Sequence, residues 1–241
     1  MEGRIPQAAA PALPVPASSS IRGDFAWTFV GNAVYAAGQW AVLSLFAKLG
    51  GAEMLGQYAL ALAVAAPVAM LAHLNLRSVL ATDTGGKHPL GDYLALRLLV
   101  TACGLAAIAV LAAFTAETTA MRAAILIVGL GLASEAVSDL CYGALQRQDR
   151  MRQVALSMMG RSLLSVAALA LALWSSGNLG WAVGALAAGR IGVLLAYDLP
   201  MGAQGESLRR TGMGAARDIF VTALPLGLVL MLISLNQNLP R

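Results

Sequence analysis

Residues 25–47 read FAWTFVGNAVYAAGQWAVLSLFA and contain no Asp, Glu, Lys or Arg. A helix of about 20 apolar residues crosses the hydrocarbon core of a bilayer, so this stretch is long enough to be a membrane span. Five more apolar stretches follow, separated by short polar segments: 54–76, 93–116, 123–146, 153–174 and 179–197. The pattern predicts an all-α fold, a multi-pass transmembrane helix bundle with six complete spans.

The composition of the whole chain supports the same fold class. Hydrophobic residues make up 59% of the 241 residues, charged residues make up 12%, and the mean hydropathy is +0.72. Soluble domains have roughly 45–50% apolar and about 25% charged residues. This chain therefore has too few charges to cover a water-exposed surface, which excludes a soluble domain.

The chain divides into four regions. Residues 1–22 carry prolines at positions 6, 11, 14 and 16 among Ala and Ser, a composition that favours a disordered tail. Residues 23–199 hold the six predicted spans and form one transmembrane lobe. Residues 200–218 are predicted to be a cytoplasmic loop, and residues 219–241 the start of a seventh transmembrane helix.

Basic residues predict the orientation, because cytoplasmic loops carry an excess of Lys and Arg. With a cytoplasmic N-terminus, the outer side holds Lys48 and Arg122, Arg190 lies inside a span, and Arg241 ends the chain. The other twelve of the 16 basic residues then lie in or near cytoplasmic loops: Arg4, Arg22, Arg77, Lys87, Arg97, Arg147, Arg150, Arg152, Arg161, Arg209, Arg210 and Arg217. The N-terminus is therefore predicted to be cytoplasmic. The net charge of +4 then reflects topology, and no nucleic-acid partner is expected.

Catalytic and metal-binding motifs are missing from the sequence. It contains no HExxH or GxSxG motif, and its two histidines, His73 and His88, differ in the polarity of their surroundings. Cys103 and Cys141 lie inside apolar stretches without CxxC spacing, so we expect small buried residues rather than ligands or a disulfide. The sequence therefore predicts no enzymatic activity, no metal site and no cofactor.

Two carboxylates interrupt the fourth apolar stretch. Glu135 and Asp139 are four residues apart and therefore share one face of a helix. A charge at bilayer depth costs about 2.5–3.5 kcal/mol on insertion scales, so such residues usually face a cavity or a partner. Two neighbouring carboxylates need a cation nearby if both are to be ionised, either an arginine or a bound ion.

Four arginines lie in the half of the predicted bundle next to the cytoplasm: Arg190, Arg77, Arg97 and Arg161. If their side chains turn inward, they form a cationic vestibule whose guanidinium groups suit phosphate oxygens. The alternative for Arg77, Arg97 and Arg161 is to extend to lipid head groups. The alternative for Glu135, Asp139 and Arg190 is a buried pair that only holds two helices together. Pro67, in the second stretch, removes one backbone hydrogen bond and marks a kink or a hinge.

Several segments are similar to a known transporter family. They are LGGAEMLGQYAL (49–60), LNLRSVLATD (74–83), DLCYGALQR (139–147), LPLG (224–227) and SLNQNLPR (234–241). In this order they resemble bacterial polysaccharide flippases of the multidrug/oligosaccharidyl-lipid/polysaccharide exporter superfamily. The resemblance implies a transporter that moves an undecaprenyl-pyrophosphate-linked oligosaccharide across the bacterial inner membrane. Such transport serves the biosynthesis of cell-surface polysaccharides, including lipopolysaccharide.

The resemblance also implies roles for the charged residues. Arg190, Arg77, Arg97 and Arg161 would bind the pyrophosphate, while Glu135 and Asp139 would balance these cations or bind a coupling H⁺ or Na⁺. The family has about twice as many spans and works by alternating access between two lobes, so the resemblance implies that the chain is one lobe and that the second lobe is missing. Expected partners are membrane lipid, the lipid-linked oligosaccharide, a second lobe and other envelope-polysaccharide assembly proteins.

Two other functions remain open from the sequence. One is a small-molecule exporter of the same superfamily, in which the carboxylates Glu135 and Asp139 would matter more than the arginines. The other is a membrane-embedded enzyme or an assembly subunit of envelope biosynthesis.

Overall fold

The computed structural model describes residues 21–83 and 86–238, and every regular element within these ranges is a helix. The predicted all-α fold class is therefore confirmed. In chain order the elements are α1 (Ile21–Leu45), the π-helical η1 (Phe46–Gly50), α2 (Gly51–His73), α3 (Leu76–Thr82), α4 (Leu90–Thr115), α5 (Thr119–Arg147), α6 (Met151–Ser176), α7 (Leu179–Val193), the π-helical η2 (Leu194–Asp198), α8 (Leu199–Ala203) and α9 (Met213–Asn238).

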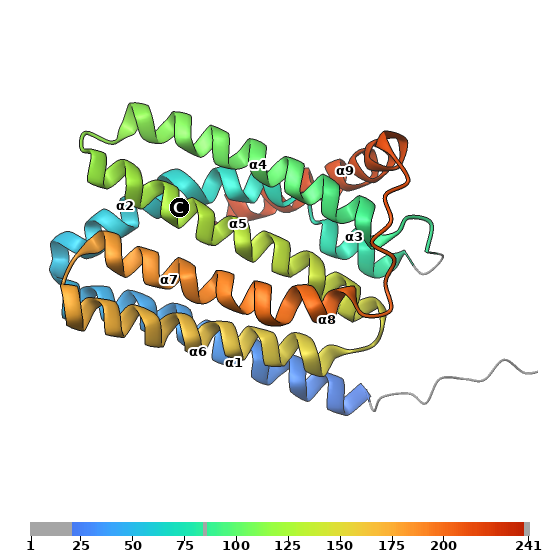
Figure 1. Ribbon diagram of the computed structural model, residues 1–241, viewed down its shortest axis with the longest axis horizontal. Helices are drawn as coiled ribbons and strands as arrows, with labels where there is room; N and C mark the ends of the chain where they lie inside the picture. Colours follow the sequence, from blue (N-terminus) through green and yellow to red (C-terminus); the bar gives the residue numbers. More distant parts are fainter. Residues whose placement is uncertain (1–20, 84–85, 239–241) are drawn as a thin grey trace, which may run out of the picture.

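Five helical runs among the described residues are long and apolar enough to cross a membrane: Arg22–Thr82, Leu90–Thr115, Thr119–Arg147, Met151–Ser176 and Leu179–Ala203. The first run turns back at η1, so α1 and α2 run in opposite directions within it (Figure 1). The six predicted spans thus fall on α1, α2, α4, α5, α6 and α7.

The two terminal regions predicted from the sequence are described only in part. Residues 1–20 of the predicted tail, and residues 239–241 at the end of the predicted seventh span, lie outside the described residues. The predicted seventh span falls on α9, which is not among the five membrane-length runs found in the described part of the chain. The sixth predicted span continues past residue 197 through η2 and α8 to Ala203.

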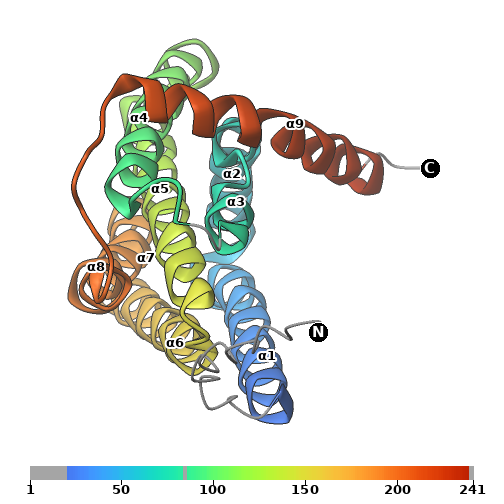
Figure 2. The ribbon, with the colours of Figure 1, turned by 90° about the vertical axis from the view of Figure 1, so that its right-hand side faces the viewer.

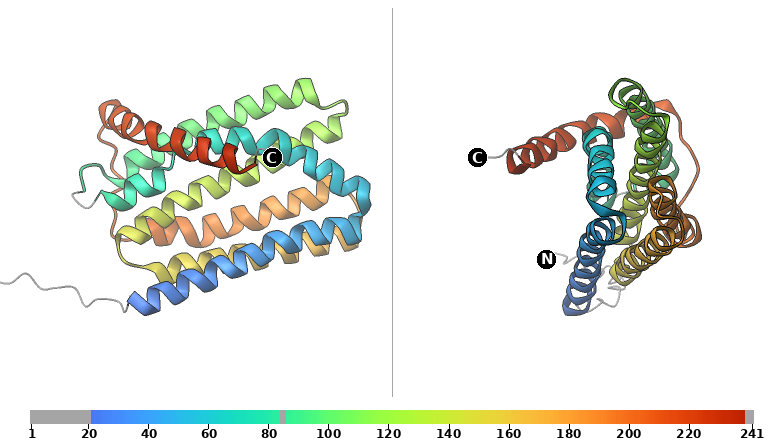
Figure 3. Two further views of the ribbon diagram at one scale, coloured as in Figure 1. Left: turned by 180° about the vertical axis from the view of Figure 1, so that it is seen from behind. Right: turned by 90° about the vertical axis from the view of Figure 1, so that its left-hand side faces the viewer.

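Helix α5 lies at the centre of the bundle, where α2, α3, α4, α7 and α8 pack against it (Figure 2). Helix α1 packs along α6, and α6 packs along α7. Helix α9 crosses α4 and α2 and then extends away from the other helices, as the view from the opposite side also shows (Figure 3). One end of the bundle holds the start of α1, the described residues between α3 and α4, the α5–α6 turn and α8 (Figure 1). We call it the basic end, because Arg150 lies in the α5–α6 turn and Arg147 and Arg152 lie at the adjoining helix ends.

Small residues allow α1 to approach α6 closely. A Cβ atom added to Gly31 would lie 2.9 Å from the Cα of Ala155, and one added to Gly38 would lie 1.8 Å from the Oγ of Ser162. The two glycines are seven residues apart, as are Ala155 and Ser162, so both contacts fall on the same pair of helix faces. Close packing on small residues is the usual way in which membrane helices associate, because lipid supplies no hydrophobic driving force between them.

The outer surface of the bundle is apolar. Large side chains such as Phe29, Trp40, Phe114, Trp174 and Trp181 are all exposed. Exposed apolar surface of this extent is unfavourable in water and suits contact with lipid.

Helix α2 is separated from α3 by a sharp break at two residues. Leu74 and Asn75 both have positive φ angles, 45° and 46°, whereas α2 continues past Pro67 without interruption. The φ of Asn75 is common for asparagine, but that of Leu74 is unfavourable for an L-residue with a bulky side chain. The break therefore occurs at a position that contains neither glycine nor proline, and it places Arg77 of α3 beside α5.

Candidate functional site

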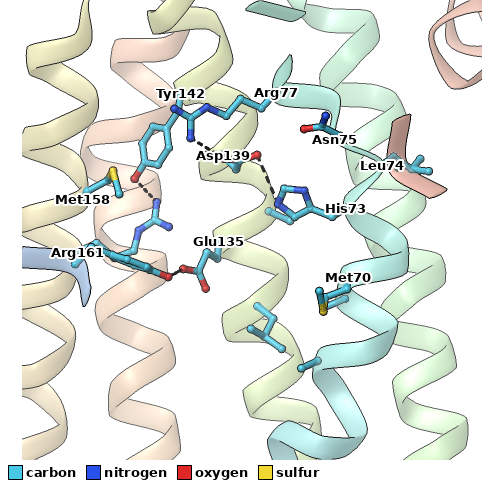
Figure 4. Close-up of a pocket in the computed structure, with 16 residues that line it drawn as sticks. Met70, His73, Leu74, Asn75, Arg77, Glu135, Asp139, Tyr142, Met158 and Arg161 are labelled. Atoms are coloured by element: carbon cyan, nitrogen blue, oxygen red, sulfur yellow. Dashed lines mark hydrogen bonds and ion pairs between the residues drawn. The ribbon is translucent and has the colours of Figure 1, made fainter. Parts of the chain in front are cut away.

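A cavity of about 460 Å³ lies beside the break between α2 and α3 (Figure 4). Its walls come from α1, α2, α3, α5, α6 and α9. The lining residues are Tyr35, Ala66, Ala69, Met70, His73, Leu74, Asn75, Arg77, Leu132, Glu135, Ala136, Asp139, Tyr142, Met158, Arg161 and Gly227. Five of these can carry a charge, and the rest of the lining is mostly Ala, Leu and Met.

Asp139 contacts an arginine and a histidine from the other side of the cavity. Its Oδ1 accepts a hydrogen bond from Nη1 of Arg77 at 3.2 Å, and its Oδ2 lies 3.5 Å from Nε2 of His73. Arg77 also donates from Nε to Oε1 of Gln146 at 3.3 Å. Because His73 is the last residue of α2 and Arg77 is the second residue of α3, the break between these helices turns both side chains toward α5 (Figure 4).

Glu135 lies one turn before Asp139 on α5 and therefore deeper in the bundle. Its Oε1 accepts a short hydrogen bond from the hydroxyl of Tyr35, and its Oε2 lies 3.4 Å from Nη1 of Arg190. The side chain of Arg190 is 9% exposed and that of Glu135 is 24% exposed. Glu135 thus lines the cavity. Arg190 contacts Glu135 without lining this cavity, and it borders two smaller cavities of about 10 Å³ each.

Arg161 belongs to a buried polar cluster on the opposite wall. Its Nη2 donates to Oδ2 of Asp198 at 2.8 Å and to the hydroxyl of Tyr142 at 2.7 Å. Ser157 donates a short hydrogen bond to the other Asp198 oxygen and lies 2.8 Å from the Tyr142 hydroxyl. The guanidinium carbons of Arg161 and Arg77 lie 5.4 Å and 5.6 Å from the centre of the Tyr142 ring, within cation–π distance. Tyr142 therefore contacts both arginines of the cavity.

Arg97 lies outside the cavity lining. It is fully buried on α4, where Nη1 donates to the carbonyl oxygens of His73 at 2.8 Å and Ala72 at 3.3 Å. These carbonyls end α2 and have no partner within the helix, because the chain turns away at Leu74. Arg97 therefore stabilises the break in the helix, and its charge opposes the negative end of the α2 dipole.

At the basic end, outside the membrane-length runs, the carboxylate of Asp83 contacts described residues that precede α4 or belong to it. Oxygens of this carboxylate accept hydrogen bonds from the backbone N–H groups of Lys87 at 3.1 Å and His88 at 3.3 Å, and from the Tyr93 hydroxyl at 3.3 Å. Burial alone raises the pKa of Asp83, but the hydrogen bonds from Lys87, His88 and Tyr93 outweigh it and lower this pKa below its ordinary value.

The structure brings four of the six predicted site residues into one cavity: Arg77, Arg161, Glu135 and Asp139. Arg190 joins them through Glu135, and Arg97 contacts the backbone behind the cavity. No cluster of three or more His, Cys, Asp or Glu side chains suited to a metal ion occurs among the described residues.

Sequence reasoning missed Asp198, Tyr35 and Tyr142 as site residues, and it gave His73 no role in a site. Asp198 follows the sixth apolar stretch directly and is fully buried because the helix continues past it. A single acid so close to an apolar run was the signal that could have identified it. The tyrosines carried no such signal, because an aromatic residue in an apolar span is usual.

Comparisons with known proteins give one informative match. The chain is 25% identical over 221 residues to a protein from Staphylococcus aureus named "Capsular polysaccharide biosynthesis protein CapF". The match covers 90% of this chain but 55% of the relative, so the chain spans about half the length of the curated relative it matches. No family model and no solved structure matches. The similarity supports a link to polysaccharide biosynthesis.

Proposed function

We propose that the chain is one lobe of a transporter for a lipid-linked oligosaccharide, carried on undecaprenyl pyrophosphate, across the bacterial inner membrane. The observation that carries the proposal is the cavity in which Arg77 and Arg161 face two carboxylates beside a broken helix. Broken helices of this kind mark substrate sites in many transporters. The similarity to a capsular polysaccharide biosynthesis protein supports a glycan precursor as the cargo.

The charged groups of the cavity suit exchange between a carboxylate and a phosphate. Arg77 and Arg161 are each paired with an aspartate, Asp139 and Asp198. A guanidinium forms similar paired hydrogen bonds with carboxylate and with phosphate oxygens. A pyrophosphate that enters can therefore take over arginine contacts that the aspartates hold in the empty cavity. The apolar remainder of the lining, which includes Met70 and Met158, suits an amphipathic molecule.

The opposite wall of the transport path would come from a second lobe. Residues of α1, α2 and α9 line the cavity together with those of α3, α5 and α6, and this chain spans 55% of its relative. Alternating access would then follow from the rocking of the two lobes around the site. We propose that the basic end faces the cytoplasm, because the loops of membrane proteins on the cytoplasmic side carry an excess of Lys and Arg.

The test uses Arg77→Ala in cells that depend on this protein for surface polysaccharide. Loss of one hydrogen bond to a charged group costs about 1.5–3 kcal/mol, so pyrophosphate affinity should fall roughly 10- to 100-fold and surface glycan should be lost. Arg152→Ala is the matched control, because Arg152 is exposed and contacts the ring of Trp27 rather than the cavity. Both variants are first checked for equal amounts in the membrane.

Normal surface glycan with Arg77→Ala would contradict the proposed cavity role. Efflux of small molecules that is lost with Glu135→Gln would instead support an exporter. Turnover of a lipid-linked substrate in detergent, without transport across vesicles, would support a membrane enzyme.

A further inference from the structure

The charges around the cavity form three pairs of opposite sign. Arg77 pairs with Asp139, Arg161 with Asp198, and Arg190 with Glu135, at N–O distances of 3.2, 2.8 and 3.4 Å. Each pair is formed by one arginine and one carboxylate, so the three pairs contribute no net charge. An anion that enters this site therefore meets cations that are already neutralised.

His73 also lines the cavity, and its imidazole belongs to none of the three pairs. Its side chain is 44% exposed, and Nε2 lies 3.5 Å from the Asp139 oxygen that Arg77 does not contact. Charged groups face it from each neighbouring element: Arg77 on α3, Arg97 on α4, and Glu135 and Asp139 on α5. A neutral imidazole leaves the cavity balanced, whereas a protonated one adds a single positive charge beside Asp139.

We propose that His73 is the proton-binding group of the cavity and takes up one proton when a phosphate-bearing anion enters. This inference rests on the proposed function, because it needs an anion in the cavity. The proton comes from water at the open side of the cavity and adds to the free ring nitrogen, with no bond broken in the anion. The imidazolium then pairs with Asp139, and Arg77 is free to turn toward the anion.

Proton uptake and anion binding thereby become linked. Each ligand favours the other by the same free energy, so anion affinity falls as His73 loses its proton. A histidine with the ordinary pKa of about 6.5 changes its protonated fraction about tenfold between pH 5.5 and pH 7.5, and a histidine with a lower pKa changes it by more. The affinity of the cavity for an anion should change by the same factor.

The experiment measures binding of inorganic sulfate to the full-length protein in lipid nanodiscs by calorimetry at pH 5.5 and pH 7.5. Sulfate keeps its double charge over this range, so any pH dependence belongs to the protein. Wild type should bind at least about tenfold more tightly at pH 5.5 than at pH 7.5. At pH 7.5, measurements in two buffers of different ionisation enthalpy should show uptake of close to one proton per sulfate.

Three variants separate His73 from other titrating groups. His73→Gln should bind weakly at both pH values, and His73→Lys, which stays charged, should bind equally at both. His88→Gln is the matched control, because His88 lies in the 83–89 loop, and it should keep the tenfold dependence. Measuring His73→Lys as well keeps the test decisive if His73→Gln fails to fold.

Two outcomes overturn different parts of the account. If neither sulfate nor pyrophosphate binds wild type at either pH, the proposed anion cavity fails and the role of His73 fails with it. If both bind but wild type shows no pH dependence, or His73→Lys keeps the tenfold change, only the proton site is overturned.

Discussion

Replacing Asp198 with alanine is expected to lower the free energy of unfolding by about 3–5 kcal/mol, the usual cost of removing one partner of a buried ion pair. The side chains of Asp198 and Arg161 are 0% and 4% exposed. Asp198 accepts hydrogen bonds from both Arg161 and Ser157, and Nε of Arg161 is already buried without a partner among the described residues. The substitution therefore leaves a buried guanidinium whose charge has lost its nearest counter-charge.

The assay is thermal unfolding in lipid nanodiscs, followed by circular dichroism. For a chain of this length 1 kcal/mol corresponds to roughly 2–4 °C, so Asp198→Ala should lower the midpoint by about 6–20 °C. The double variant Asp198→Leu/Arg161→Met removes both charges and should recover most of this loss, because well-packed apolar residues can replace a buried pair. Asp218→Ala is the matched control, because its pair with Lys87 at 3.7 Å is 60% and 72% exposed. Exposed pairs contribute about 0–1 kcal/mol.

An Asp198→Ala midpoint within 2 °C of wild type would refute the reasoning. So would a double variant as unstable as the single one, because the loss would then come from packing and not from an unpaired charge.

Three further predictions concern the bundle itself. Gly31→Ala should lower the free energy of unfolding by about 1–3 kcal/mol, because the added Cβ would lie 2.9 Å from the backbone of α6. Gly160→Ala is the control and should leave the thermal midpoint unchanged, because nothing lies within 4 Å of a Cβ added there. Arg97→Met leaves the carbonyl oxygens of Ala72 and His73 without their side-chain donor and should lower the free energy of unfolding by about 1–3 kcal/mol. Faster amide hydrogen exchange confined to residues 74–80 would support this prediction, and unchanged exchange would contradict it. The hydrogen bonds that lower the pKa of Asp83 stabilise the fold fully at neutral pH, and this contribution is lost as the pH falls below about 4 and through the lowered pKa. Wild type should therefore lose more stability than Asp83→Asn between pH 5 and pH 3. Equal losses would show that these hydrogen bonds contribute nothing to stability.

The helices could be predicted from the sequence because hydropathy depends on the length and composition of each stretch alone. Glu135 and Asp139 could also be placed on one face of α5, since a spacing of four residues fixes it. For Arg97 the sequence predicts the position along the helix but not the contacts of the side chain. Its depth in the span was readable, but the direction of its side chain depends on the carbonyls that α2 leaves free at His73.

The break between α2 and α3 could not be located in advance. Pro67 is the residue that local chemistry favours for a kink, yet α2 continues past it and ends six residues later, at His73. The left-handed backbone at Leu74 is tolerated because Arg97 binds the carbonyls before it and Gly227 of α9 packs against it. Both partners are distant in sequence. No local pattern contains that information.

The central claim is that this cavity carries a pyrophosphate-linked lipid from one leaflet to the other. The most direct measurement reconstitutes the full-length protein in vesicles with a fluorescent undecaprenyl-pyrophosphate oligosaccharide and follows quenching of the label in the outer leaflet. Protein-dependent movement between leaflets is expected, and Arg77→Ala should abolish it whereas Arg152→Ala should leave it intact. Movement at the same rate in protein-free vesicles, or in vesicles with Arg77→Ala, would contradict it.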